Sequence, residues 1–347
     1  MSIAPLAPIS APAAALRVQV ISAVETGLMA ALDAVEVAEA TPPADQTRPP
    51  TPPPANALRQ AVDTARADAA VRQAGAAPLF ADLAEAVRAP DLPPAIRAAI
   101  SQVLALRTVL AAPISAETVR QAVAQSGLFL EARLLNGAAP DEALPPDLKA
   151  ALLTLQRALA AAPAADTPLA ARPATTPPPV REAALSAQPA TPPTLSAADG
   201  APVIAQHLAR EADQAVARQV LHQLASLPNG VAPAWMFELP VATPQGTGLA
   251  QFEIGRDGAQ PGSGHPTEAW RVRFSIDIEP LGPVHVHLRM EGEQAAVTIW
   301  AEREDGLERL RGQGARLASA LPAEVIFHPG APRRPLPESG QFVDRSW

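Results

Sequence analysis

Two histidines near the carboxyl end of the chain have a spacing that could bind a metal ion. His285 and His287 lie two residues apart in a run of alternating apolar and polar residues, so both are expected on the polar face of one strand. Such a pair binds zinc when a third ligand converges on it, and His328 or Asp277 could supply that ligand. The simpler interpretation is a solvent-exposed strand face, and we expect neither a metal nor another cofactor.

Two carboxylates in the same region could act as an acid and a base. Asp277 and Glu279 share one strand face, but no further residue supports catalysis. The Gly-Ser-Gly-His sequence at 262–265 lacks the strand-turn-helix frame of a nucleophile elbow. Gly312 and Gly314 lie inside a predicted helix rather than at its start, which argues against a phosphate site. The chain has no cysteine, which excludes thiol catalysis. We expect no catalytic residue and no enzyme activity.

These residues lie in the most regularly patterned stretch of the chain, from Trp270 to Glu302. Alternation with period two predicts strands that each bury one face. The apolar residues of the successive runs are Val272, Phe274, Ile276 and Ile278; Val284, Val286, Leu288 and Met290; and Ala295, Val297, Ile299 and Ala301. Residues 279–283 and 291–294 contain the prolines and glycines that end each run. Short connections of this kind predict an antiparallel meander.

The meander is expected to belong to a compact α+β domain over 235–330. Leucines three and four residues apart predict an amphipathic helix over 303–321, laid across the apolar face of the sheet, and 323–330 reads as a final short strand. Residues 235–239 and 248–254 are further strand candidates, and their pairing is left open.

The chain in front of this domain is dominated by proline and alanine. It is expected to be partly helical and largely disordered, because alanine buries little surface to offset chain entropy. The predicted order is a weak helix that could serve export at 1–40, a proline-rich linker at 41–56, a helical region at 57–161, a Pro/Ala/Thr-rich linker at 162–200 and a long helix at 201–227. Residues 331–347 are expected to form a mobile tail.

Apolar spacing within 57–161 predicts a loose bundle of marginal stability. The stripes are Leu79, Phe80, Leu83 and Val87; Ile96, Ile100, Val103, Leu106 and Leu110; and Leu148, Leu152, Leu155 and Leu159. Ser115 is a candidate helix cap, with Glu117 placed in the first turn of the same helix.

Charge and hydropathy exclude other function classes. The net charge is −8, without the basic excess that binding to a nucleic-acid backbone needs. No run of apolar residues is long enough to span a membrane. The first residues lack the basic start of a secretory signal.

The best-patterned stretch resembles the C-terminal domain of the flagellar hook-length control protein family. That family is marked by a Pro-Leu-Gly turn, a strand of alternating aliphatics, a short turn, a strand ending in an alanine-acid pair, and an amphipathic helix. The corresponding residues are Pro280, Leu281 and Gly282; Val284, Val286 and Leu288; Val297 and Ile299; Ala301 and Glu302; and Leu307, Leu310, Leu317 and Leu321. The resemblance covers less than a third of the chain, and the short Pro/Arg-containing tail departs from the family's glutamine-rich one.

The resemblance implies a protein that is cytoplasmic at first and is then secreted through the flagellar type III channel. Its N-terminal region would act as a ruler, and its C-terminal domain would switch export from hook to filament proteins. Implied partners are the cytoplasmic domain of the export-gate switch component and the hook and hook-cap proteins, and we expect a monomer. The alternatives are a non-catalytic scaffold that uses the same domain for another partner and, more weakly, a hydrolase-like domain on a disordered stalk.

The residues expected to meet the export gate are Pro280, Leu281, Gly282, Val284, Val286, Leu288 and Trp300. The Pro-Leu-Gly turn has an equally good interpretation as a simple connection between two strands. Trp300 is expected on the polar strand face beside Thr298, where it could contact a partner or be covered by the helix at 201–227.

Overall fold

The computed structural model describes residues 54–110, 115–135, 145–163, 176–227, 234–257, 269–292, 294–320 and 323–332. The chain divides into two compact units: residues 1–178 with 192–224, and residues 179–191 with 225–347. We call them the helical unit and the C-terminal domain. The helix predicted within 1–40, most of the linker at 41–56 and the tail from 333 onwards lie outside the described residues.

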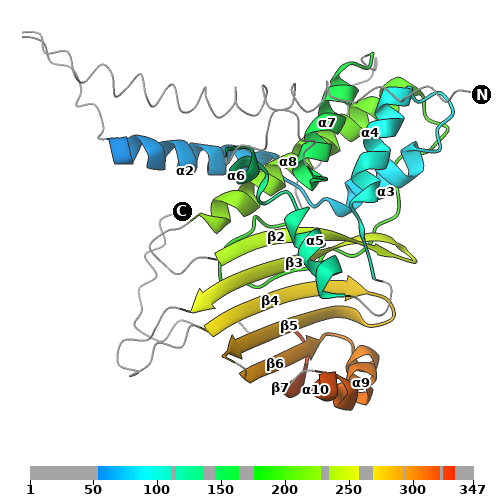
Figure 1. Cartoon of the computed structure of the whole chain (residues 1–347). Helices are drawn as coiled ribbons and strands as arrows, with labels where there is room; N and C mark the ends of the chain where they lie inside the picture. The colour runs from blue at the N-terminus through cyan, green and yellow to red at the C-terminus, as the bar shows by residue number, and fades with distance from the viewer. Residues whose placement is uncertain are drawn as a thin grey trace, which may run out of the picture. The chain divides into compact units, whose positions relative to one another are not determined.

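The helical unit is built from amphipathic helices (Figure 1). They are α2 Pro54–Arg72, α3 Ala77–Ala86, α4 Pro94–Ala105, α5 Ala116–Ala124, α6 Leu130–Leu135, α7 Leu148–Ala160 and α8 Ala201–Ser226, with the short strand β1 at Thr108–Val109. The Ser115 hydroxyl accepts the Thr118 N–H and caps α5, as predicted. Asp147 caps α7 in the same way through the Ala150 N–H. Side-chain caps therefore mark where two of these helices begin.

The predicted apolar stripes form the core of this unit. Leu79, Phe80 and Leu83 of α3 are buried, as are Ile96, Ile100 and Val103 of α4 and Leu148, Leu152, Leu155 and Leu159 of α7. The stripe on α4 is shorter than predicted, because the helix ends at Ala105 with Leu106 as its C-cap. Leu110 is 37 % exposed as a result.

In the C-terminal domain the strands follow one another across the sheet in chain order (Figure 1). They are β2 Ala234–Thr243, β3 Gly246–Asp257, β4 Ala269–Ile278, β5 Gly282–Glu291, β6 Gln294–Ala301 and β7 Ala323–Pro329. Each pair from β2 to β6 is antiparallel, and β7 lies parallel to β6. The predicted meander is confirmed, and the two strand candidates whose pairing was open become β2 and β3, which pair with each other.

The helix predicted over 303–321 is two helices, α9 Glu304–Gly312 and α10 Gly314–Ala320. The expected packing is confirmed, because Leu310 and Leu317 contact the buried cluster of Val284, Val297 and Ile299 on one face of the sheet. Just after the break, α10 lies close to β7: a Cβ on Gly314 would lie 3.1 Å from the Phe327 ring. Glycine at the start of α10 thus allows close approach of the helix to β7.

Part of the linker expected over 162–200 instead lies on the C-terminal sheet. We call residues 182–188 the strap. Gln188 makes two backbone hydrogen bonds with Leu249 of β3, at 2.8 and 2.9 Å. Buried polar side chains accept further strap N–H groups, as when Gln251 accepts that of Ser186 at 2.8 Å and Ser275 that of Ala187 at 3.1 Å. The strap is fixed largely through its backbone, and Leu185 is its one large apolar side chain in the core, so the segment has no periodic apolar signal.

Candidate partner-binding surface of the C-terminal domain

The Pro-Leu-Gly turn between β4 and β5 has a defined backbone geometry. The Glu279–Pro280 peptide bond is cis, and the Leu281 N–H donates to the Ile278 carbonyl at 2.8 Å. Gly282 has φ of +71°, a conformation that side chains with a Cβ rarely adopt. The Glu302 N–H donates to the Pro283 carbonyl at 3.1 Å and ties the turn to the residues just before α9.

Two glycines let the turn pack against the start of α9. A Cβ on Gly306 would lie 2.2 Å from the Leu281 carbonyl oxygen, and a Cβ on Gly282 would lie 2.3 Å from Cδ of Arg303. The first contact is with backbone, so it cannot be relieved by a change of side-chain rotamer. The turn and the N-terminal end of α9 therefore form one tightly packed structure.

Acidic groups gather around this turn. The Arg303 guanidinium donates to both Glu279 oxygens at 2.9 Å and to Asp305 at 3.2 and 3.3 Å. Glu302 and Glu304 are exposed beside them. We call the exposed residues Glu279, Pro280, Glu302, Arg303, Glu304 and Asp305 the turn surface. Its four acids against one arginine leave an excess of negative charge.

The excess of negative charge also raises the pKa of Asp277, which lies on the adjoining strand face. Burial raises the pKa of this carboxyl, and the negative charges of Glu279 and Glu302 raise it further, against a smaller opposing effect of Arg303. These carboxylates are therefore close enough to repel one another, which favours binding of a positively charged group.

Trp300 lies in an aromatic group on the sheet face opposite α9 and α10. Its ring is 4.6 Å from the His287 ring and stacks on the His328 ring at 5.6 Å. Burial lowers the pKa of His287 to about 4, with help from the positive charges of Arg273, His285 and Arg271, so this ring is neutral at neutral pH. Because His285 bonds Glu302 at 2.9 Å, this face is continuous with the turn surface.

Comparison with known families identifies the segment that contains this turn. Residues 259–326 match the family model described as flagellar hook-length control protein FliK. This segment is similar to the hook-length control domain of that family. The match includes β4, β5, β6, α9 and α10, and it leaves β2, β3 and the strap outside. Neither a curated protein nor a solved structure matches the chain. Among the described residues, no helix is long and apolar enough to cross a membrane.

The structure places the predicted partner-binding residues in two different environments. Val284 is buried, Val286 and Leu288 are partly buried, and all three face α9 and α10 as part of the apolar core, which leaves little of them accessible to a partner. Leu281 packs against the same cluster. Pro280 is exposed at the turn. The other accessible groups are mainly the acids of the turn surface, among them Glu279, which the sequence offered as one half of a possible acid-base pair.

The two histidines whose spacing could bind a metal have separate partners. His285 bonds Glu302, whereas His287 packs against Trp300. Within the part of the chain that the structure describes, the group of three close metal-ligand side chains is Asp82, His207 and Glu211, in the helical unit. The candidate metal-binding residues of the described chain therefore lie in the helical unit rather than on the sheet.

Proposed function

We propose that the chain is a flagellar hook-length control protein that acts as a ruler through its N-terminal region and as an export switch through its C-terminal domain. The observation that carries the proposal is the family match at residues 259–326, which covers the turn, the strands and the helices that form one packed structure. We further propose that it has no catalytic activity and works only by contact with other proteins.

The N-terminal region is long enough to serve as a ruler. Fully extended at about 3.3 Å per residue, the roughly 230 residues in front of β2 would reach on the order of 750 Å, and any helix, at about 1.5 Å per residue, shortens this. Passage through a narrow channel requires the helical unit to unfold. The alanine-rich helix α2 adds little to the cost of unfolding, whereas α3, α4 and α7 bury leucine, isoleucine and phenylalanine side chains that unfolding must expose.

The turn surface is the part of the C-terminal domain best suited to meet the export gate. It combines an exposed proline and an excess of acidic side chains on a turn that Gly282 and Gly306 allow to pack tightly against α9. A rigid acidic surface favours a basic partner surface, and attraction between exposed charges weakens as salt rises. Trp300 would extend this contact, because aromatic side chains contribute strongly at interfaces.

The remaining partners and the localisation follow from the same proposal. The protein would start in the cytoplasm as a monomer, enter the type III channel, and meet hook and hook-cap proteins during passage. The contact with the export-gate component would follow, once the C-terminal domain reaches it.

Two experiments test the roles separately. Insertion of residues into 41–53 should lengthen hooks in proportion to the insertion, while the same insertion after Gly330 should leave hook length unchanged. Hooks of constant length across the series would contradict the proposed ruler role.

For the switch, Glu304→Lys reverses an exposed charge on the turn surface, and Glu324→Lys reverses an exposed charge on β7. Only the first should impair filament assembly, with both variants folded by circular dichroism.

The second candidate is a non-catalytic scaffold that uses the domain for a different partner. It is favoured by the limited range of the family match, which leaves the whole helical unit outside. Deletion of the gene separates the two candidates, because a scaffold for another process leaves normal flagella.

A further inference from the structure

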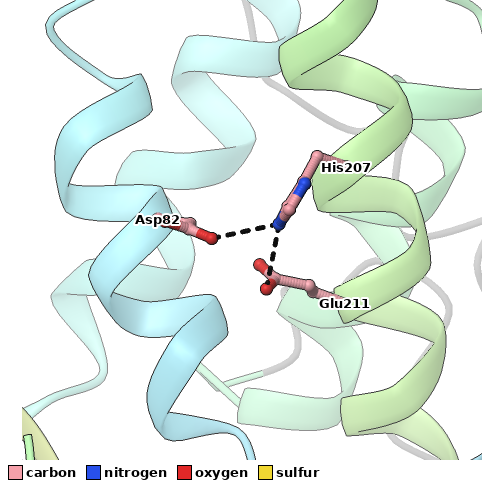
Figure 2. A group of neighbouring side chains, drawn as sticks. All are labelled: Asp82, His207 and Glu211. Atoms are coloured by element: carbon pink, nitrogen blue, oxygen red, sulfur yellow. Dashed lines mark ion pairs between the residues drawn. The ribbon is translucent and has the colours of Figure 1, made fainter. Parts of the chain in front are cut away.

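Three ionisable side chains meet inside the helical unit, although α3 and α8 are far apart in sequence (Figure 2). Asp82 projects from α3, and His207 and Glu211 project from successive turns of α8. Nε2 of His207 lies 3.2 Å from Oδ2 of Asp82 and 3.3 Å from Oε1 of Glu211. The exposed fractions of the side chains are 0 % for Asp82, 11 % for His207 and 7 % for Glu211. The cluster is therefore almost entirely shielded from solvent.

The cluster brings two carboxylates to one imidazole, and burial raises the pKa of Glu211. Hydrogen bonds to Asp82 and Glu211 raise the pKa of His207 to about 9. Burial raises the pKa of Asp82, but hydrogen bonds from His207 and Thr194 outweigh it and lower the pKa to about 2. Oε2 of Glu211 is buried and has no hydrogen-bond partner, and the guanidinium of Arg210 stays 3.5 Å from the His207 ring nitrogens. A buried carboxylate oxygen without a partner is costly unless a cation binds it.

We propose that Asp82, His207 and Glu211 form a binding site for a divalent transition-metal ion of the zinc class. One imidazole nitrogen and two carboxylate oxygens are a ligand set that such ions accept. Ligand atoms placed 2.0–2.1 Å from a tetrahedral ion are about 3.3 Å apart, which is close to the two distances from Nε2. The ion would take the place of the proton that His207 now shares between the carboxylates.

The surroundings of the cluster supply the outer contacts of a metal site. Oδ1 of Asp82 accepts the N–H groups of Thr194 and Leu195 at 2.5 and 3.0 Å, which fixes the orientation of the carboxylate. The Thr194 hydroxyl lies 2.6 Å from Oδ2 of Asp82 and 3.1 Å from the His207 ring, where it or a water molecule would complete the coordination. A bound ion would thus join α3, α8 and the segment around Thr194.

The site goes beyond hook-length control and does not depend on it. A metal ion that binds only the folded helical unit would stabilise that unit by mass action. Export would then require the ion to be lost before the unit unfolds, because metal binding and folding are coupled.

The test uses the full chain, purified in the presence of a chelator and then titrated with zinc. Bound zinc is measured by equilibrium dialysis and metal analysis, and the thermal midpoint of the helical circular dichroism signal is followed with and without zinc. Cobalt serves as a second probe, since its visible spectrum reports on coordination, and magnesium serves as a hard-cation control. The variants are Glu211→Gln and His207→Gln, with His287→Gln as the matched control outside the cluster.

The proposal expects a single zinc ion per chain and a thermal midpoint that rises with zinc. Both site variants should lower the affinity by about 100-fold or more, beyond the effect of losing an outer contact, and His287→Gln should leave it unchanged. Absence of tight zinc binding by the folded chain would overturn the proposal and leave the cluster as an ion pair. Full zinc binding by folded Glu211→Gln and His207→Gln would overturn it as well, because the ion would then lie elsewhere.

Discussion

The helical unit and the C-terminal domain are held together by different kinds of contact. In the helical unit, buried polar side chains join distant segments, as when Arg218 bonds both Gln73 and the Pro177 carbonyl. In the C-terminal domain, neighbouring strands are also neighbours in sequence, and the cluster around Val284 and Val297 is apolar. Both units also bury apolar side chains, so the comparison teaches where the long-range polar contacts lie: between helices in the helical unit, and mainly at the strap in the C-terminal domain.

The largest effect is expected at Asp82. Replacing it with alanine removes the acceptor of two backbone N–H groups and leaves His207 without one of its carboxylates. Loss of a partner from a buried, charged hydrogen-bond network costs about 3–5 kcal/mol of the free energy of unfolding. Chemical denaturation followed by circular dichroism measures it.

The matched control is Asp63→Ala in α2, where the ion pair with Arg66 is exposed at both ends. Exposed pairs contribute about 0.2–1 kcal/mol at most, so the control should hardly move the transition. Equal shifts of the denaturation transition in the two variants would contradict the claim that buried polar partners help to stabilise the helical unit.

The next effect concerns backbone shape in the C-terminal domain. Gly306→Ala places a Cβ 2.2 Å from the Leu281 carbonyl oxygen, which forces the turn away from α9 and should cost roughly 3 kcal/mol. Tryptophan fluorescence is a selective measurement, because all 4 tryptophans lie at position 235 or beyond.

Gly312→Ala provides the control within the same helix. A Cβ at Gly312 meets nothing within 4 Å, and alanine favours helix over glycine by about 1 kcal/mol. The two substitutions are therefore expected to have opposite signs. If both substitutions destabilise the domain, the effect of alanine in α9 has a cause other than the close contact with the turn.

The regular parts of the fold could be predicted from the sequence because their signals are local. Alternation with period two predicted β4, β5 and β6, and leucines at helical spacing predicted α7. The alternation that marks a strand does not say which of its faces a helix covers. Val284 therefore looked like a candidate contact, although it lies in the core.

The contacts that escaped prediction are long-range and involve polar groups. The strap binds through its backbone to Gln251 and Ser275, so its own side chains carry no apolar pattern. Asp82 meets residues more than a hundred positions away, and no local spacing marks such a meeting. The close approach of α10 to Phe327, which Gly314 allows, is likewise defined only in the folded sheet.

A smaller effect is expected where the strap meets the sheet. Ser275→Ala leaves the Ala187 N–H without its acceptor on a fully buried part of β4, which should cost about 1–2 kcal/mol. The same fluorescence transition measures it. An unchanged transition would show that the strap adds nothing to the stability of the C-terminal domain.

A further effect is a pH dependence of the C-terminal domain. The pKa of His287 is about 4 in the folded domain and 6.5 in the unfolded chain, so between these values the unfolded state binds more protons. The stability should therefore fall as the pH is lowered from 6.5 towards 4. His287→Gln should flatten this part of the fluorescence-detected profile, and an unaltered slope would assign the dependence to other groups.

The most direct test of the central claim is electron microscopy of hooks from cells whose chain lacks residues 269–332, compared with cells that carry the full chain. The proposed function expects overlong hooks without filaments, because the switch is lost while the hook continues to grow. Hooks of normal length that bear filaments would contradict it.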